Sequence, residues 1–508
     1  MSTTDMPSRS TYCSQPINGA TPTTIANPVD KVFQDNFLND VFWALSSQGP
    51  AFAIDEANVH FVEGPVDFFD QLISGIRRAK HRINMASLYL GTGKHEQQLV
   101  DEMIAACKRN STLKVHILVD GLRGTRLGPS TEKPGIRVSS ATMLQPLLNQ
   151  FQSRVSISMY HTPDLNGVLK RILPPRVNEV IGVQHLKAYV FDDDLIIGGA
   201  NLSKDYFTDR QDRMVCIYRT ASLSTFFDNV VNTIGELSLK QDTNGNSVNQ
   251  GTIDPVTESS QFKLMAEKRL ASLLEPNSFY TADNFKHSLS SPLDVQSSTS
   301  KATWIFPTIQ MGPFNIRHDE VCSSYIFANI PSTSKFFVAS PYFNLTKNYL
   351  QLILSGKPQI DIITCSPETN GFAGATGMSG VVPDLYGIIE RRFLQKTIDT
   401  GNSGRISIVE YIRHKWSYHA KGMWITAPDQ KLPNITLIGS PNFGSRSVEK
   451  DLEAELIFIT ENEALRQKMN SERMNLWRET QTVDMPMLNA RKVTLWVRFI
   501  VYLFGNYL

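Results

Sequence analysis

The chain is poor in cysteine. Its 508 residues include only five cysteines, which are scattered and contain no CxxC pair. Disulfide-built secreted domains and cysteine zinc sites need paired or closely spaced cysteines, so we expect a reducing compartment and neither kind of site. The sequence also lacks an HExxH pattern, and we predict no metal.

A charge excess and long apolar runs are also missing. The 50 Lys+Arg residues balance 49 Asp+Glu residues, which gives no sign of a protein that coats nucleic acid, and we expect no nucleic-acid partner. No run reaches the roughly 18 uncharged apolar residues that span a bilayer. The start of the chain is rich in Ser, Thr, Pro and Asn and makes a poor secretory signal or transit peptide. We expect residues 1–36 to be disordered.

Two parts of the chain repeat one order of features. An HxK tripeptide is followed by a G-[GS]-x-N turn, and a carboxylate stands eleven positions after the Asn. Strand-like and helical patterns precede the HxK in both parts. This repetition predicts an α/β fold with two pseudo-symmetric halves, each a mixed β-sheet flanked by helices, and an active site at their interface. The repeated residues are His185, Lys187, Asn201 and Asp212, and His419, Lys421, Asn442 and Glu453.

We expect the halves to cover residues 37–240 and 303–485. Residues 241–302 are polar and Ser-rich in places and are predicted to be a linker with one helix near 260–274. Residues 486–508 form an apolar segment with Trp496 among its aromatics. Such a segment suits the membrane interface, and the alternative is a last helix that packs on the core.

The HxK spacing has a chemical meaning. Residues i and i+2 of a strand point to the same side, so each motif puts an imidazole and an ammonium on one face. Two such faces suit a tetrahedral phosphate: one His attacks phosphorus and the other protonates the leaving oxygen. The Lys side chains and the amides of Asn201 and Asn442 can hold the non-bridging oxygens. Asp212 and Glu453 can accept a hydrogen bond from each imidazole, and no cofactor is required.

The motifs resemble a known superfamily. HLKAYVFDDDLIIGGANLS at 185–203 matches the HxKxxxxD signature of the phospholipase D superfamily through His185, Lys187 and Asp192. The chain is more narrowly similar to eukaryotic-type phosphatidylglycerophosphate synthases, which are CDP-diacylglycerol–glycerol-3-phosphate 3-phosphatidyltransferases. In the second motif, Thr426 stands where the signature has Asp, and this departure suggests that Asp192 is a structural support. The segments that carry the narrower resemblance are MASLYLGTG at 85–93, IGVQHLKAYVFD at 181–192, GGANLSKDYFTDRQDR at 198–213, WSYHAKGMW at 416–424 and LIGSPNFGSRS at 437–447.

The resemblance implies an enzyme with two substrates, CDP-diacylglycerol and sn-glycerol 3-phosphate. Its products are phosphatidylglycerophosphate and CMP, in the committed step toward phosphatidylglycerol and cardiolipin. The implied catalytic residues are His185, Lys187, Asp192, His419 and Lys421, with His185 as nucleophile through a phosphohistidine. The resemblance also implies a membrane surface as partner and the mitochondrial inner membrane as location.

Two other functions stay open at this point. A phosphodiesterase of the same superfamily, either a lipid hydrolase or a nuclease, would use water as the acceptor. A non-catalytic membrane-binding protein with a degenerate site is permitted by the irregular second motif, although both HxK pairs are intact.

Two further groups of residues are candidates for binding substrate phosphates. The loop of Ala86, Ser87, Leu88, Tyr89, Leu90, Gly91, Thr92 and Gly93 follows a strand and can offer backbone N–H groups to a nucleotide. CDP is the expected nucleotide, ATP is not excluded, and a tight turn is the simpler interpretation. Each candidate arginine is individually more typical of a surface or structural role. The candidates for the acceptor phosphate are Arg123, Arg126, Arg210, Arg213, Arg413 and Arg446.

Overall fold

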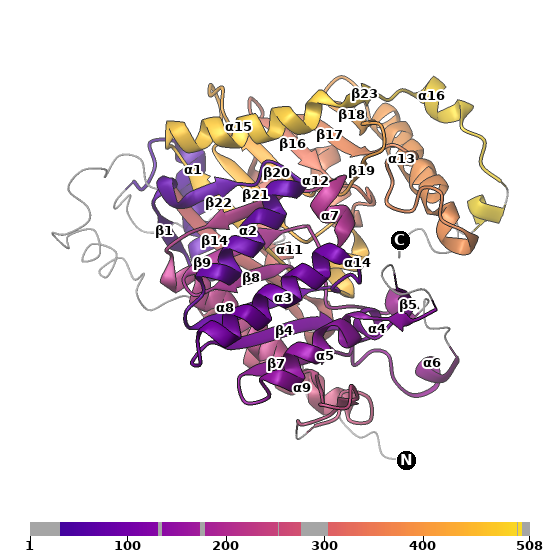
Figure 1. Cartoon of the computed structure of the whole chain (residues 1–508). Helices are drawn as coiled ribbons and strands as arrows, with labels where there is room; N and C mark the ends of the chain where they lie inside the picture. The colour runs from indigo at the N-terminus through magenta and orange to yellow at the C-terminus, as the bar shows by residue number, and fades with distance from the viewer. Residues whose placement is uncertain are drawn as a thin grey trace, which may run out of the picture.

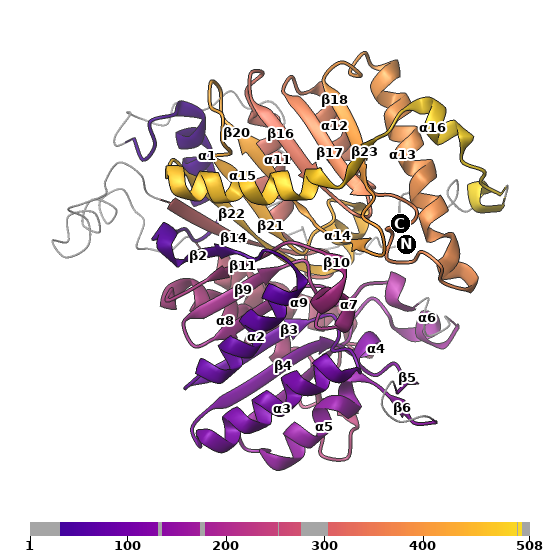
Figure 2. The ribbon, with the colours of Figure 1, turned by 45° about the horizontal axis from the view of Figure 1, so that its top comes forward.

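Two large mixed β-sheets, one above the other, organise the chain (Figures 1 and 2). The computed structural model describes residues 31–130, 135–172, 178–251, 253–275, 303–494 and 496–499. Most of the segment expected to be disordered and residues 276–302 of the expected linker lie outside these ranges. The predicted α/β class with two related halves is confirmed.

The first sheet has nine strands. Its three central parallel strands β7, β4 and β3 are followed by the antiparallel strands β8, β9 and β11. In order across the sheet, the strands are β13 (Ser247–Val248), β12 (Leu239–Gln241), β7 (Val155–Tyr160), β4 (Lys114–Asp120), β3 (Arg82–Ser87), β8 (Ala188–Phe191), β9 (Asp194–Gly198), β11 (Met214–Ile217) and β2 (Val59–Phe61).

The second sheet repeats this plan. Strands β18, β17 and β16 are parallel, and β20, β21 and β22 continue antiparallel, in the same relative order as their counterparts. In order, the strands are β1 (Phe52–Ile54), β14 (Thr303–Met311), β22 (Leu452–Thr460), β21 (Ile435–Gly439), β20 (Gly422–Thr426), β16 (Lys335–Ala339), β17 (Gln359–Cys365), β18 (Ile406–Tyr411) and β23 (Thr480–Thr482), with β15 (Ile316–Arg317) beside β14.

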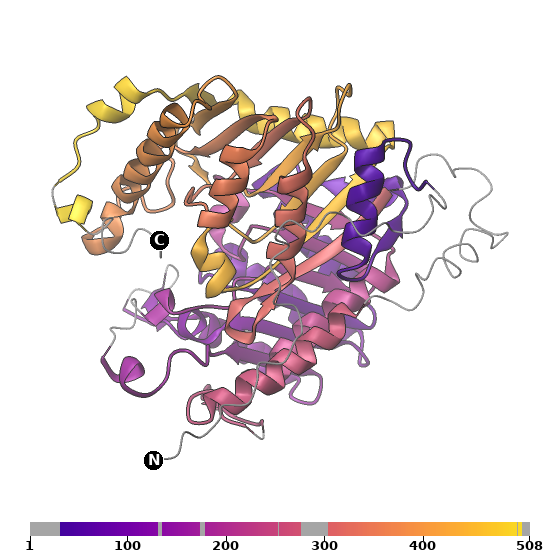
Figure 3. The same cartoon turned by 180° about the vertical axis from the view of Figure 1, so that it is seen from behind.

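Helices cover both outer faces and enter the space between the sheets. Figure 3 shows α1, α11 and α12 against the outer face of the second sheet. The helices of the first half are α2 (Pro65–Arg78), α3 (Lys94–Arg109), α4 (Gly121–Gly124), α5 (Ser140–Gln150), α6 (Gly167–Ile172), α7 (Lys204–Thr208) and α8 (Ala221–Glu236). The others are α1 (Asn36–Ser46), α9 (Ser259–Ala271), α11 (His318–Asn329), α12 (Lys347–Ser355), α13 (Val382–Asp399), α14 (Ser445–Glu449), α15 (Glu463–Arg478) and α16 (Met485–Ala490).

Short 3-10 turns and two-stranded ribbons complete the described chain. The turns are Glu56–Asn58, Asn178–Val180, Ser272–Leu274, Gly312–Phe314 and Gly377–Val381, and the ribbons pair β5 (Gly128–Pro129) with β6 (Arg137–Val138) and β10 (Arg210–Gln211) with β19 (Ser417–Tyr418).

Burial on both faces explains the apolar strands. Strand β14 is buried along its whole length, and β22 and β20 are as well, as expected for strands that are covered on each side. One hydrophobic core is shared by the halves and contains Leu186 and Val230 of the first half with Tyr418 and Leu465 of the second. Because this core contains residues of both halves, the two halves pack together as one body. The HxK segments lie where the halves meet.

The division of the chain differs from the expected one at residue 37. Helix α1 packs in the core of the second half, and β1 pairs with β14 there, before the chain crosses to the first sheet at β2. The predicted helix near 260–274 is present as α9, and its Phe262 contacts Phe314 of the second half. Among the described residues, no helix has the length and apolar character that a bilayer crossing requires.

The turn between β8 and β9 is held by Asp192. The residue has φ of 52°, and its carboxylate accepts hydrogen bonds from the backbone N–H groups of Lys80, His81 and Arg82 at 2.7, 2.8 and 2.9 Å. These contacts fasten the β8–β9 turn to the beginning of β3. Asp192 therefore stabilises the sheet at the end of β8 opposite to the HxK motif.

We predict that Asp192→Ala lowers the free energy of unfolding by about 1–3 kcal/mol, because three N–H groups lose their acceptor and Ala disfavours positive φ. Urea denaturation measures the change. Asp193→Ala in the same turn is the matched control, because the Asp193 side chain is exposed. Equal stability of the two variants would contradict the structural role of Asp192.

Candidate active site

The first HxK motif lies in an extended segment just before β8. The backbone N–H of His185 donates to the carbonyl oxygen of Leu452 at 2.9 Å, so this segment is attached to the second half of the chain. The ammonium of Lys187 donates to the carbonyl oxygen of His185 at 2.5 Å. This short loop of contacts holds both side chains of the motif in place.

The second motif has the same arrangement with the halves exchanged. Strand β19 pairs with β10 of the first half, and the backbone N–H of His419 donates to the carbonyl oxygen of Gln211 at 2.7 Å. The ammonium of Lys421 donates to the carbonyl oxygen of His419 at 2.9 Å. Each histidine is therefore hydrogen-bonded through its backbone to the residue just before the supporting carboxylate of the opposite half.

The imidazoles and carboxylates are paired across the halves. His185 Nδ1 lies 2.9 Å from Glu453 Oε2, and His419 Nδ1 lies 2.7 Å from Asp212 Oδ2. All four side chains are close to fully buried, with 12 % of His185 and 6 % of His419 exposed. A carboxylate on Nδ1 places the proton there and leaves the Nε2 lone pair for chemistry.

The two motifs act on each other electrostatically. Burial lowers the pKa of His185 well below its usual value, and the Lys187 ammonium lowers it further. Burial lowers the pKa of His419 well below its usual value, and Lys421 and His185 lower it further. Burial lowers the pKa of Lys187 far below that of an exposed lysine and the pKa of Lys421 to about 8. Crowded cationic groups of this kind favour the binding of an anion, which relieves their repulsion.

The pKa values of the two supporting carboxylates shift in the opposite direction. Burial raises the pKa of Asp212 to about 6, while Lys421 opposes the change. Burial also raises the pKa of Glu453, against the effect of Lys187. Burial thus raises the pKa of both carboxylates, which suits a partner that holds an imidazole through a proton transfer.

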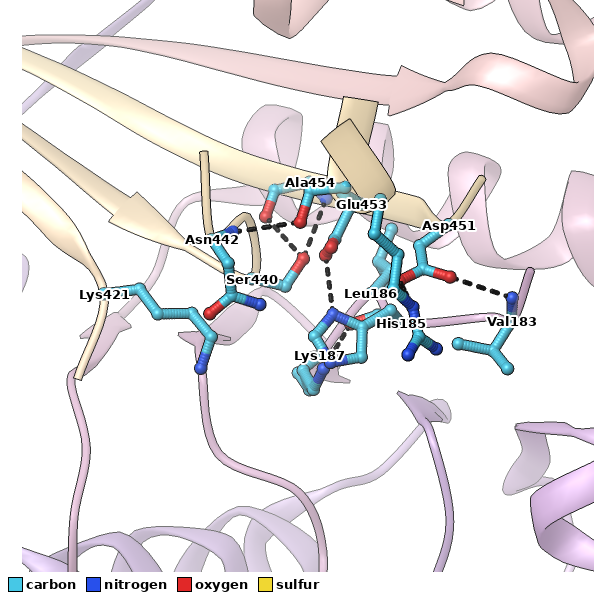
Figure 4. Close-up of polar contacts among 12 residues, drawn as sticks. Val183, His185, Leu186, Lys187, Lys421, Ser440, Asn442, Asp451, Glu453 and Ala454 are labelled. Carbon is cyan, nitrogen blue, oxygen red and sulfur yellow. Dashed lines mark hydrogen bonds and ion pairs between the residues drawn. The ribbon is translucent and has the colours of Figure 1, made fainter. Parts of the chain in front are cut away.

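The two G-[GS]-x-N turns carry Asn201 and Asn442. The Oδ1 atoms of both side chains are buried and lack a hydrogen-bond partner, and Asn201 Nδ2 donates to Tyr206 Oη at 3.1 Å. Figure 4 shows Asn442 and Lys421 reaching from the second half toward the space beside His185. The Gly in the first turn is required sterically, because a Cβ on Gly199 would lie 2.2 Å from Asp212 Oδ1.

Asp192 is not part of this site, which corrects its assignment as a catalytic residue. Its carboxylate is bound to backbone N–H groups at the far end of β8, as described above. The signature Asp thus has a structural task, and this is consistent with a second motif that carries Thr426 at the equivalent position.

Two of the candidate arginines flank the site. Arg210 stacks over Tyr206 at 4.7 Å and contributes to the lowered pKa of His419. Arg446 donates to Asp451 at 3.0 Å and acts in the same way on His185. These two guanidinium groups lie on the His419 side and the His185 side of the site, respectively.

The other four arginines have structural partners. Arg123 and Arg126 pair with Glu179, and Arg413 stacks on Trp416. Arg213 points away from the imidazoles, where it binds Glu472 at 2.9 Å and stacks on Trp424 at 3.7 Å. Its guanidinium also donates to the carbonyl oxygen of Lys421, and this contact fixes the backbone of the second motif.

Three backbone N–H groups of the loop at 86–93 already have acceptors within the protein, which argues against the nucleotide-binding assignment. Leu90 donates to Ser140 Oγ, Gly91 to the carbonyl oxygen of Leu202, and Gly93 to a carboxylate oxygen of Glu96. That Glu96 carboxylate would also repel a phosphate. The tight-turn interpretation fits these contacts.

Asp451 is a site residue that the sequence reasoning missed. Its carboxylate accepts hydrogen bonds from the Val183 N–H at 3.0 Å and from Arg446, next to His185. Ligand atoms of His185, Asp451 and Glu453 lie within 4.8 Å of one another, but these hydrogen bonds engage both Asp451 oxygens. In the sequence, the one indication of a role for Asp451 is its position two residues before Glu453.

Comparison with known proteins completes the description. A family model described as "Cardiolipin synthase, PLD-like domain" matches residues 72–232. The fold is similar to that of phosphatidylserine synthase from Haemophilus influenzae, with a TM-score of 0.65 and 20 % identity over 92 % of this chain and 97 % of that one.

Several proteins resemble the chain over most of its length. A probable CDP-diacylglycerol–glycerol-3-phosphate 3-phosphatidyltransferase of Dictyostelium discoideum is 58 % identical over 94 % of this chain and 82 % of its own. The mitochondrial protein of that name from Homo sapiens is 39 % identical over 90 % and 84 %, and the one from Saccharomyces cerevisiae is 33 % identical over 89 % and 88 %. The chain thus belongs to the CDP-diacylglycerol–glycerol-3-phosphate 3-phosphatidyltransferase family, within the phospholipase D superfamily.

Proposed function

We propose that the chain transfers the phosphatidyl group of CDP-diacylglycerol to sn-glycerol 3-phosphate and releases CMP. The product is phosphatidylglycerophosphate, the committed precursor of phosphatidylglycerol and cardiolipin. The observation that carries this proposal is the pair of buried imidazoles, each oriented by a carboxylate of the opposite half. The relatives named for this reaction support the choice of substrates.

In the first step, His185 Nε2 attacks the phosphorus that carries diacylglycerol. The bond from phosphorus to the CMP oxygen breaks. The bound diphosphate favours the protonated form of His419, which gives the CMP oxygen its Nε2 proton. Glu453 holds the proton on His185 Nδ1, so the attacking lone pair faces the substrate. Lys187, Lys421 and the two Asn amides stabilise the charge that develops on the non-bridging oxygens.

In the second step, a hydroxyl of sn-glycerol 3-phosphate replaces CMP. His419 takes the proton of that hydroxyl, its oxygen attacks phosphorus, and the bond to His185 Nε2 breaks. Both histidines then return to their starting states. The acceptor phosphate needs a cation near the phosphohistidine, and Arg446 is the side chain that meets this need, beside His185.

The deciding experiment measures CMP release from CDP-diacylglycerol with and without sn-glycerol 3-phosphate. We expect release to depend on the acceptor and the lipid product to be phosphatidylglycerophosphate. His185→Ala and His419→Ala should each reduce turnover by about a thousandfold or more, since each removes a group that acts on the reacting atoms. Trapping with labelled lipid after denaturation at alkaline pH, where the P–N bond of a phosphohistidine is stable, would place the label on His185.

Two outcomes would contradict this assignment. Release of CMP that ignores the acceptor and yields phosphatidate would identify a hydrolase instead. Full turnover by either histidine variant would remove that histidine from the mechanism.

The buried lysines predict an alkaline limit on activity. Lys421 must be protonated to hold phosphate, and the pKa of this lysine is about 8 in the free site, so kcat/KM should fall as the pH rises through about 8. A bound diphosphate favours the ammonium and raises this pKa, so kcat should decline only at higher pH. Steady-state profiles measure both.

Lys421→Arg serves as the comparison, because a guanidinium keeps its charge throughout this range. Its residual kcat/KM should decline at a higher pH than that of the wild type. A profile of kcat/KM that stays level up to pH 10 in the wild type would contradict the prediction.

We further propose that the chain acts at the mitochondrial inner membrane. A lipid substrate requires a membrane surface, and animal relatives carry the word mitochondrial in their names. Val497 is buried against Leu385 and Ile388 of α13, whereas Trp496 and Phe499 are 49 % and 61 % exposed. Arg498 and Lys492 line a cavity of about 250 Å³ beside them. Exposed aromatics next to cations suit the interface of an anionic bilayer.

We predict that the double variant Trp496→Ala/Phe499→Ala binds anionic liposomes several-fold more weakly than the wild type, because interfacial aromatic contacts are lost. Flotation with cardiolipin-containing vesicles measures the binding. Leu264→Ala is the control, since Leu264 is an equally exposed apolar residue on α9. Similar loss in the control, or none in the double variant, would contradict this surface assignment.

A further inference from the structure

Three aromatic side chains form a wall that runs outward from His419. The ring of Tyr342 lies 5.7 Å from that of His419, nearly perpendicular to it at 79°. Tyr342 in turn contacts Phe372 at 6.0 Å and Tyr386 at 5.3 Å. We call Tyr342, Phe372 and Tyr386 the aromatic wall.

The aromatic wall is partly open to solvent. Tyr342 and Tyr386 are half-buried, and 39 % of Phe372 is exposed on the loop between β17 and α13. A contiguous apolar surface beside a polar catalytic centre marks a place where a ligand binds. Planar rings at such a place favour a planar ligand, which they contact by stacking.

The lack of a side chain at Gly371 lets the Tyr342 phenol and the Arg210 guanidinium approach the backbone of this loop. A Cβ at Gly371 would lie 3.0 Å from Tyr342 Oη and 3.6 Å from a terminal nitrogen of Arg210. The phenol and the guanidinium therefore both lie next to this glycine. An aromatic surface and a cation that can hold phosphate thus lie next to each other, as a nucleotide requires.

We infer that the aromatic wall binds the cytosine ring of CDP-diacylglycerol and Arg210 its cytidylyl phosphate. The inference rests on the proposed function, in which His419 is the acid that protonates CMP. The leaving nucleotide must then lie on the His419 side, where the wall begins. Cytosine is the planar aromatic part of the two substrates. The nucleotide is therefore placed by loops of the second half and not by the loop at 86–93.

The experiment measures the contribution of the base to binding. The full-length His185→Ala protein, which cannot turn over, is titrated calorimetrically with CMP and with ribose 5-phosphate, which lacks the base. We expect CMP to bind about tenfold more tightly, the size of effect that one base–aromatic stacking contact gives. Tyr342→Ala and Phe372→Ala, each added to this protein, should reduce that ratio toward one.

Two variants make the result interpretable. Phe372→Ala removes the most exposed ring and so poses the least risk to folding, and Tyr342→Phe keeps the ring and should keep the affinity ratio. Tyr89→Ala tests an aromatic ring outside the aromatic wall, where Tyr89 stacks with Arg123 at 4.5 Å. A ratio that falls with Tyr89→Ala and not with the aromatic-wall variants would overturn the inference.

The failure of this inference is distinguishable from failure of the proposed function. If the wild type releases CMP only with sn-glycerol 3-phosphate but the ratio is unchanged in Tyr342→Ala and Phe372→Ala, the aromatic wall does not bind cytosine. If these two variants raise KM for CDP-diacylglycerol without changing the ratio, the wall contacts the lipid, which also overturns the inference. If the wild type releases no CMP, the proposed function itself fails.

Discussion

The burial of two imidazoles and two ammonium groups at one point governs the structure of this protein. Burial lowers the pKa of all four groups, and repulsion from neighbouring cationic groups lowers it further. Asp212 and Glu453 offset part of this repulsion. The remainder favours an anion, and a diphosphate provides one where the two substrates meet. The same electrostatic imbalance that costs stability in the empty site thus gives binding energy for the substrate.

The site requires both halves of the chain, because each half supplies the carboxylate that orients the histidine of the other half. Neither half contains a complete pair, because His185 is oriented by Glu453 and His419 by Asp212. Arg213 of the first half also connects the two halves, because its side chain binds Glu472 and backbone carbonyl oxygens of the second half. A shift of one sheet against the other would therefore disturb both imidazoles together.

Around this symmetric centre, the surroundings of the two histidines differ. His419 has aromatic neighbours in Tyr206 and Tyr342, whereas His185 has Asp451 and Arg446 at its side. A duplicated fold supplies two equal catalytic groups, and loops that are not duplicated give them different tasks. Here the aromatic side suits a nucleotide and the charged side suits a small phosphorylated alcohol.

The sequence by itself determined the duplicated α/β plan and the identity of the central residues. The order of strand-like and helical segments, the HxK spacing and the eleven-residue step from Asn to carboxylate are local patterns. Such patterns can be recognised in the sequence without knowledge of the tertiary structure. The sequence placed Asp192 among the catalytic residues and the loop at 86–93 among the candidate nucleotide-binding segments, because a signature and a glycine pattern do not show which groups already have hydrogen-bond partners.

Only the tertiary structure decided which carboxylate serves which histidine, which arginines reach the site and that α1 and β1 join the second sheet. Residues such as Glu453 and His185 are 268 positions apart. Their pairing depends on how two sheets pack across a shared core, and no short-range pattern contains that information.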